Sequence, residues 1–381
     1  MGVTFPVVGM VGGGQLARMT HQAGIPLGVQ FKLLSDGPRD SAALVAADVV
    51  VGDYRDLETL RAFARGCDVV TFDHEHVPTE HLRALQADGV VVRPGPDALV
   101  HAQDKGVMRA RLTAIGVPCP RHRIVTGPAD VTAFAAEGDG YPVVLKTVRG
   151  GYDGKGVWVV RGEQEAAEPF RAGVPVLAEE KVDFVRELAA NVVRSPHGQA
   201  VAYPVVESVQ VGGVCDTVIA PAPGLDPERS AHAQDLALRI AAELGVTGHL
   251  AVELFETTDG RVLVNELAMR PHNSGHWTQD GSVTSQFENH LRAVLDLPLG
   301  DPRPRAPWTV MANVLGGDYP DMYFGYLHCM ARDPGLKIHM YGKDVKPGRK
   351  VGHVNVAGDD LADVRDRARH AADYLRGTIQ E

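Results

Sequence analysis

The segment His249-Leu-Ala-Val-Glu-Leu-Phe-Glu-Thr-Thr-Asp-Gly-Arg-Val-Leu-Val-Asn-Glu266 carries the strongest β-hairpin pattern in the chain. Its two arms, 250–255 and 261–266, are rich in apolar and β-branched residues, as strands are. Asp259-Gly260 between them is typical of a two-residue type I′ turn, which requires positive φ at both central positions. With this turn, Thr258 pairs with Arg261, and counting outward predicts that Glu253 lies directly opposite Glu266.

Two carboxylates on facing strands predict a cation site. Cross-strand partners lie roughly 5 Å apart on one face of a sheet, and like charges there repel each other. A divalent cation between the carboxylates would remove the conflict, and hard oxygen ligands suit magnesium. The alternative is that both carboxylates point into water. The next segment, 269–277, favours a site, because its guanidinium, amide and two imidazoles can bind an anion or a phosphate.

The composition predicts a multidomain globular protein. A chain of 381 residues is too long for one simple core, so two or three domains are expected. A net charge of −10 argues against non-specific binding to nucleic acid. Cys67, Cys119, Cys215 and Cys329 are far apart and form no C-x-x-C pair, as expected in a reducing compartment. Without a signal pattern or a long apolar run, no membrane association and a cytoplasmic location are predicted.

The N-terminal pattern is that of a doubly wound α/β domain. A strand at 6–11 leads into Gly12-Gly13-Gly14 and a helix, which leaves backbone N–H groups free to bind a phosphate or a ribose. A tight turn without a ligand is the alternative, and the glycine spacing is not the strict dinucleotide fingerprint. Further strands are expected at 48–53 and 68–72. The polar residues 73–76 then either bind a ligand at the strand end or cap the helix near Pro78.

The middle of the chain predicts a nucleotide site. A strand at 141–147 carries Lys146, the glycine-rich loop 149–156 follows, and a second strand spans 157–160. Such a loop can cover phosphates as a flap, although a plain hairpin tip is the alternative. A strand at 176–184 and Glu187 offer backbone groups for adenine and a carboxylate for ribose. Helices are expected at 103–115, 225–244 and 286–295, and short strands after residue 304. The basic run 343–350 is either a phosphate clamp or solvated surface.

Four blocks resemble the N5-carboxyaminoimidazole ribonucleotide synthetase family of the ATP-grasp superfamily: residues 12–19, 149–156, 270–278 and 341–353. The resemblance implies a multidomain α/β (α+β) fold. It divides the chain into an N-terminal Rossmann-like open parallel sheet (1–103), a small lid subdomain (104–186), a large ATP-grasp subdomain (187–300) and a β-rich, hybrid-motif-like C-terminal region (301–381). The implied reaction joins 5-aminoimidazole ribonucleotide and bicarbonate at the expense of ATP, through carboxyphosphate, in purine biosynthesis.

The resemblance also implies roles for individual residues. The ATP site would consist of Lys105, Lys146, Gly151, Tyr152, Asp153, Gly154, Lys155, Gly156, Glu179, Glu180, Lys181, Val182, Glu187, Gln210, Asn265 and Glu266. The ribonucleotide would contact Gly14, Gln15, Leu16, Glu75, Tyr152, Asp153, Lys155, Lys343 and Arg349. Bicarbonate and the reactive intermediate would lie among Arg270, His272, Asn273 and Ser274. Glu253 and Glu266 would bind Mg²⁺, or Mn²⁺ in its place. Asp153 is a candidate proton acceptor, with substrate positioning as the equal alternative.

The sequence departs from the family pattern in four places. Lys105 and Lys155 stand where the family usually has Arg, and Gln210 replaces a His found in some members. Asp73-His74-Glu75-His76 replaces a more usual Glu-Phe-Glu-Asn. Asn265 raises a different question, because the counted hairpin ladder directs its side chain away from the carboxylate face.

Three other functions compete with this hypothesis. A formate-using glycinamide ribonucleotide transformylase would share the ATP site and differ in the bicarbonate loop. An NAD-dependent oxidoreductase built on the glycine turn would leave Glu253 and Glu266 unexplained. A non-catalytic nucleotide-binding regulator would not need Arg270. The resemblance further implies a homodimer and a pathway link to the mutase that accepts the product.

Overall fold

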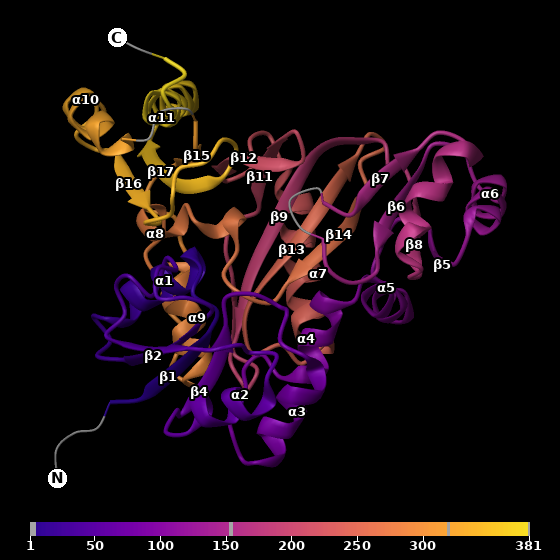
Figure 1. Ribbon diagram of the computed structural model, residues 1–381. Coiled ribbons are helices and arrows are strands. Elements are labelled where there is room, and N and C mark those ends of the chain that lie inside the picture. The colour runs from indigo at the N-terminus through magenta and orange to yellow at the C-terminus, as the bar shows by residue number, and fades with distance from the viewer. Residues whose placement is uncertain (1–4, 152–154, 318–320, 380–381) are drawn as a thin grey trace.

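A computed structural model describes residues 5–151, 155–317 and 321–379. Three β-sheets form the molecule, and helices cover them (Figure 1). The N-terminal sheet lies at the lower left of the view and the small sheet on the right, and the large central sheet runs from the middle to the upper left. No helix in the described ranges is long and apolar enough to cross a membrane.

The N-terminal sheet is parallel, with the strand order β3-β2-β1-β4. Its strands are β1 (Val7–Val11), β2 (Gln30–Ser35), β3 (Asp48–Val51) and β4 (Val69–Phe72), and its helices are α1 (Gln15–Gly24), α2 (Leu57–Ala64) and α3 (Thr79–Ala87). The predicted Rossmann-like open sheet is therefore confirmed. The carboxyl ends of β1 and β4 lie side by side, which is where open α/β sheets bind ligands.

The small sheet, the lid, is antiparallel, with the order β5-β8-β6-β7. It contains β5 (His122–Val125), β6 (Val143–Thr147), β7 (Val157–Val160) and β8 (Val176–Glu180), with α6 (Pro128–Ala136) and the 3₁₀ segment η1 (Glu163–Ala172). The helix expected at 103–115 is α5 (Lys105–Ala114), and a separate helix that was not predicted, α4 (Pro96–Gln103), precedes it. Asp104 separates them, because its backbone is extended and its carboxylate caps α5 by accepting from the Val107 N–H.

The central sheet has nine strands in the order β14-β13-β9-β11-β12-β15-β17-β16, with β10 beside β9. They are β9 (Phe184–Arg194), β10 (Ala200–Ala202), β11 (Val206–Val211), β12 (Val214–Ala220), β13 (Gly248–Thr257), β14 (Val262–Ala268), β15 (Trp308–Leu315), β16 (Lys337–Met340) and β17 (Lys350–Gly358). Because β12 pairs with β15, the sheet continues across the domain boundary predicted at residue 300. The C-terminal region also contains α10 (Gly325–Arg332) and α11 (Leu361–Arg376), which the sequence patterns did not predict.

Two helices hold the sheets in place. α7 (Pro227–Glu243) packs its apolar face against β9 and β13. α9 (Gln286–Val294) lies between the central and N-terminal sheets (Figure 1), where Leu291 and Val294 pack against Val8 and Val69. Both helices were predicted from the sequence, at 225–244 and 286–295. Through this contact, α9 fixes the position of the N-terminal sheet relative to the central sheet.

Candidate active site

The hairpin places Glu253 opposite Glu266, as predicted. The predicted turn is wrong, however. Three residues, 258–260, form the loop, and the Thr257 N–H donates to the carbonyl of Arg261. Gly260 has φ 82°, whereas Asp259 is not among the described residues with positive φ, so this is not a type I′ turn.

A β-bulge restores the predicted pairing. Leu254 pairs with Val264, but Glu253 pairs with Glu266, so Asn265 is the extra residue. A bulge redirects the side chains of the strand that contains it. The Asn265 side chain consequently faces the same cleft as Glu266, and its Oδ1 accepts from the Lys146 Nζ at 2.9 Å. The counted ladder predicted the wrong face for Asn265, because the count did not include the bulge.

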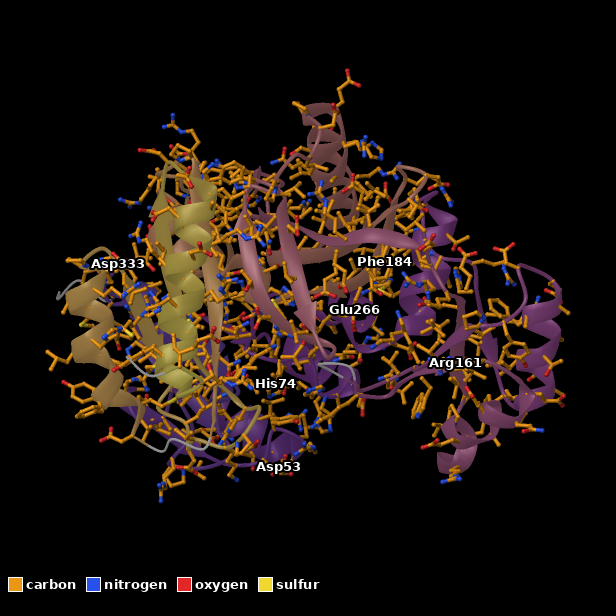
Figure 2. All side chains as sticks on the ribbon, turned by 90° about the horizontal axis from the view of Figure 1, so that it is seen from above. Asp53, His74, Arg161, Phe184, Glu266 and Asp333 are labelled. Carbon is orange, nitrogen blue, oxygen red and sulfur yellow. The ribbon has the colours of Figure 1, made fainter. Side chains whose placement is uncertain are left out.

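A cleft of about 850 Å³ lies between the lid, the central sheet and the N-terminal sheet. It brings together most of the predicted site residues, which are Gln15, Leu16, Glu75, Lys105, Lys146, Gly151, Lys155, Gly156, Glu179, Glu180, Lys181, Val182, Glu187, Gln210, Glu253, Asn265, Glu266, Arg270, His272, Asn273 and Ser274. Figure 2 shows Glu266 and Phe184 in the middle of the molecule, between Arg161 of the lid and Asp333 near the C-terminal helices. Tyr152, Asp153 and Gly154 lie outside the described residues.

The carboxylate pair suits a hard cation. Burial raises the pKa of Glu253 well above its ordinary value, and the neighbouring Glu266 and Glu187 raise it further. Lys105 Nζ lies 2.9 Å from Glu266 Oε1, and His272 Nε2 lies 3.4 Å from Glu253 Oε1. Within the described ranges, no group of three or more His, Cys, Asp or Glu residues is arranged to hold a metal ion. Two carboxylates are nevertheless the usual protein share of a magnesium site that also uses substrate phosphates.

Lys146 lies beside the carboxylates and is held by two acceptors. Its Nζ is 2.7 Å from Glu179 Oε2 and 2.9 Å from Asn265 Oδ1. Glu179 is buried and also accepts from the Arg109 Nε at 2.5 Å. Burial would raise the pKa of Glu179, but Lys146 and Arg109 overcome that effect and lower it. Arg109 was missed by sequence reasoning, because an arginine within a charged helix pattern gives no sign of being buried.

The lid edge offers the groups expected for a nucleoside. Lys181, Val182 and Glu187 line the cleft, and burial raises the pKa of Glu187. Glu180 also lines the cleft, but its Oε1 already accepts a hydrogen bond from the Arg121 N–H at 2.8 Å within the lid. Gln210 lines the cleft and donates from Nε2 to the Ser208 Oγ at 2.8 Å.

The glycine turn is not a free anion site. The Gly14 N–H donates to the Asp73 carboxylate, so an acidic side chain already occupies the start of α1. Burial raises the pKa of Asp73 to about 6. Residues 73–76 line the cleft. The alternative that they cap α3 is wrong, because no side chain caps the start of that helix. Glu75 instead pairs with Arg270 at 2.8 Å, and the Lys343 Nζ donates to the Gln15 Oε1.

The loop after β14 is a set of preoriented polar groups. The Arg270 side chain is half-buried, and the Ser274 Oγ lies 2.9 Å from the His272 Nδ1 and 3.1 Å from the Asn191 Nδ2. The Asn273 Nδ2 is buried without a hydrogen-bond partner in the described structure. A buried amide donor without a partner is costly, and a bound anion would satisfy it.

The basic run contributes a residue that sequence reasoning overlooked. Arg349 is exposed and donates to the Asp344 carbonyl at 3.3 Å. Among the described residues, Lys350 lines the cleft, whereas Lys343 and Arg349 do not. Lys350 begins β17, where neighbouring side chains point to opposite faces. This alternation was the available signal, but choosing between Arg349 and Lys350 required knowing where β17 begins.

Comparison with known proteins agrees with this geometry. The ribonucleotide synthetase preATP-grasp domain model matches residues 5–103, the ATP-grasp domain model matches 110–287, and the phosphoribosylaminoimidazole carboxylase C-terminal domain model matches 309–367. N5-carboxyaminoimidazole ribonucleotide synthase of Mycobacterium tuberculosis is 57% identical over 377 residues, covering 97% of this chain and 88% of the relative. The Corynebacterium ammoniagenes synthase is 50% identical over 97% of this chain and 92% of the relative.

Solved structures show the same similarity. The Thermus thermophilus synthetase superposes with a TM-score of 0.87 at 38% identity, covering 98% of this chain and 99% of the other. The Aspergillus clavatus synthase, solved with ADP and 5-aminoimidazole ribonucleotide, has a TM-score of 0.89 at 32% identity, covering 98% and 99%. These relatives confirm the predicted ATP-grasp ligase. The chain belongs to the N5-carboxyaminoimidazole ribonucleotide synthase family.

Proposed function

We propose that the cleft catalyses the ATP-dependent carboxylation of 5-aminoimidazole ribonucleotide by bicarbonate, giving N5-carboxyaminoimidazole ribonucleotide, ADP and phosphate. The observation that carries the proposal is one continuous cleft lined by two sets of groups. One set is Lys146, Asn265 and the carboxylate pair, and the other is Arg270 with the Asn273 amide, whose Nδ2 has no hydrogen-bond partner among the described residues. The A. clavatus relative, solved with ADP and the ribonucleotide, supports the same pairing of ligands.

The first step would be phosphoryl transfer. A bicarbonate oxygen attacks the γ-phosphorus of ATP, the bond to the β-phosphate breaks, and carboxyphosphate and ADP form. Lys146 and Lys105 offset the charge that builds on the transferring group. A divalent cation held by Glu253 and Glu266, Mg²⁺ or Mn²⁺, would neutralise phosphate charge there. We propose Asn265 as the residue that keeps the Lys146 ammonium aimed at the phosphates.

The second step would join the two substrates. The exocyclic amine of the ribonucleotide attacks the carboxyl carbon of carboxyphosphate, or of CO₂ released from it, and phosphate leaves. Arg270, His272, Asn273 and Ser274 would hold the carboxyl group, and Glu75 would orient Arg270. The lid has a clear purpose, because carboxyphosphate hydrolyses in bulk water. The proton acceptor Asp153 stays a prediction, since it lies outside the described residues.

Several finer proposals accompany this reaction. We propose contacts of Gly14, Gln15, Leu16, Lys343 and Arg349 with the ribonucleotide, although the Asp73 carboxylate at Gly14 argues that its phosphate lies nearer Lys343. The homodimer, the link to the downstream mutase, the cytoplasmic location and the domain boundaries at 103, 186 and 300 also stay predictions.

The test is ADP release by purified protein with MgATP and bicarbonate, with and without 5-aminoimidazole ribonucleotide. We expect strong stimulation by the ribonucleotide, a loss of roughly 100-fold or more in Glu266→Ala, and normal activity in Glu58→Ala, which removes an exposed carboxylate on α2. Stimulation by formate and glycinamide ribonucleotide instead would overturn the substrate assignment. Full activity of Glu266→Ala would overturn the metal site.

A further inference from the structure

Four residues form a closed ring of hydrogen bonds at the junction of lid and central sheet. The Arg109 Nε donates to Glu179 Oε1 at 2.5 Å, and Glu179 Oε2 lies 2.7 Å from the Lys146 Nζ. The Lys146 Nζ donates to the Asn265 Oδ1 at 2.9 Å, and the Arg109 Nη2 donates to the Asn265 backbone carbonyl at 2.7 Å. The Arg109 Nη1 also donates to the carbonyl of Val264 at 2.9 Å.

The ring connects three parts of the fold. Arg109 comes from α5, Lys146 and Glu179 come from the lid strands β6 and β8, and Asn265 is the bulge of β14. Lys146, Glu179 and Asn265 line the cleft. The Arg109 side chain is only 1% exposed and is not among the residues that line it. Arg109 therefore reaches a bound nucleotide only through the residues that it holds.

We propose that Arg109 is a positioning residue for phosphoryl transfer, because it fixes Lys146 through Glu179 and fixes the β14 bulge through the carbonyls of Val264 and Asn265. This inference rests on the proposed function and extends it to a residue outside the cleft. Phosphoryl transfer depends on placing charges accurately around the transferring group, and an error of about 1 Å can cost roughly 100-fold in rate.

The three donor directions of Arg109 distinguish this role from simple charge pairing. A planar guanidinium can bond a carboxylate and two carbonyls at once, whereas a lysine ammonium in the same place is a point charge on a flexible stem. Lysine at this position would still neutralise Glu179. It would lose the geometry that aligns the bulge, so the two roles respond differently to Arg109→Lys.

The chain offers a matched control. Arg186 likewise bonds three acceptors, in its case two carboxylates and one carbonyl. Its Nε lies 2.5 Å from Glu256, its Nη1 lies 3.1 Å from Glu207, and its Nη1 also donates to the Pro223 carbonyl. None of these four residues is among those that line the cleft. Arg186→Lys therefore makes the same chemical change in a comparable ion-pair network without touching the ring.

The experiment measures kcat and the KM for ATP at saturating ribonucleotide and bicarbonate, together with the Tm, for both lysine variants. We expect kcat of Arg109→Lys to fall roughly 10- to 100-fold, with the KM for ATP changed less than about threefold. Arg186→Lys should keep the wild-type kcat, while its Tm falls by about as much as the Tm of Arg109→Lys. Equal kcat losses in the two variants, or full kcat in Arg109→Lys, would overturn the proposal.

A second variant covers the case in which Arg109→Lys does not fold. Glu179→Gln keeps the side-chain shape and leaves Arg109 in place, but it removes the charge that holds the Lys146 ammonium. We expect kcat to fall roughly tenfold or more, and an unchanged kcat in the folded variant would overturn the proposal. A wild-type protein that releases no ADP in response to the ribonucleotide would refute the proposed function instead, so the two failures are distinguishable.

Discussion

At the scale of single residues, the site keeps groups that the fold alone would not favour. Glu253 and Glu266 face each other across two strands, and burial adds to their repulsion. The Asn273 Nδ2 is buried and has no hydrogen-bond partner within the described part of the chain. Such groups are destabilising until a ligand satisfies them, so function and stability are expected to conflict here.

The first prediction concerns Glu253→Gln in the presence of a chelator. Because the folded-state pKa of Glu253 is raised above its ordinary value of 4.5, the folded protein binds more protons than the unfolded chain above pH 4.5. Wild-type stability therefore falls as pH rises through the raised pKa, and the variant lacks this loss. We expect Glu253→Gln to be more stable than wild type at pH 9, by roughly 1 kcal/mol, and to have lost activity.

Urea unfolding at pH 6 and pH 9 measures this difference. Glu58→Gln, on the surface of α2, provides the control for a change in net charge. If Glu253→Gln exceeds wild type in stability by no more at pH 9 than at pH 6, the two carboxylates do not oppose each other in the folded protein.

The prediction of site residues from sequence succeeded where a residue type and a strand pattern agreed. Glu253, Glu266 and Lys146 come together in the cleft as the patterns indicated. Arg109 and Lys350 were missed for a physical reason. Whether a long basic side chain points inward depends on packing against distant segments, and short-range periodicity does not contain that information.

At the scale of elements, the β13–β14 hairpin shows how a correct pairing can follow from an incorrect turn. The three-residue loop shifts the register by one residue, and the bulge at Asn265 shifts it back. A ladder counted from the turn predicts Glu253 opposite Glu266 and misplaces Asn265. Bulges depend on contacts such as those of Arg109 with the bulge carbonyls, so the hairpin sequence alone could not reveal this one.

Helix α9 provides the second prediction, which concerns acid stability. His290 links two sheets, because its Nδ1 accepts from the His249 N–H at 3.1 Å and its Nε2 lies 2.9 Å from the Thr71 Oγ1. Burial lowers the pKa of His290 to about 3 from 6.5. The unfolded chain then binds more protons below pH 6.5, so this contribution to stability is lost as pH falls from 6.5 toward 3.

His290→Asn should therefore weaken the pH dependence of stability. Asparagine keeps an acceptor for the His249 N–H but does not titrate, so we expect the slope between pH 6 and pH 4.5 to decrease by up to about 1.4 kcal/mol per pH unit. Urea unfolding at several pH values measures the slope, with the exposed His232→Asn as control. An identical slope in wild type and His290→Asn would show that His290 is not a source of acid sensitivity.

At the scale of the whole molecule, one sheet unites regions that sequence patterns separate. The family resemblance implies a domain boundary at residue 300, yet β15 pairs with β12 on one side and β17 on the other. Strand pairing over about 90 residues of sequence separation leaves no short-range signal. The parallel N-terminal sheet was easier to predict, because its strands alternate with helices along the chain.

The last prediction tests this continuity by truncation. A chain ending at residue 303 would leave β12 as an edge and expose Val218 and Ile219, which are buried in the whole chain. Unpaired apolar edges favour aggregation. We expect this fragment to be insoluble or to unfold without a cooperative transition, whereas a chain ending at residue 378, which retains α11, should unfold as wild type does. Thermal unfolding and ADP binding measure both. A fragment 1–303 that unfolds cooperatively and binds ADP would mean that the large subdomain folds independently, and that β15 to β17 add to a sheet already stable without them.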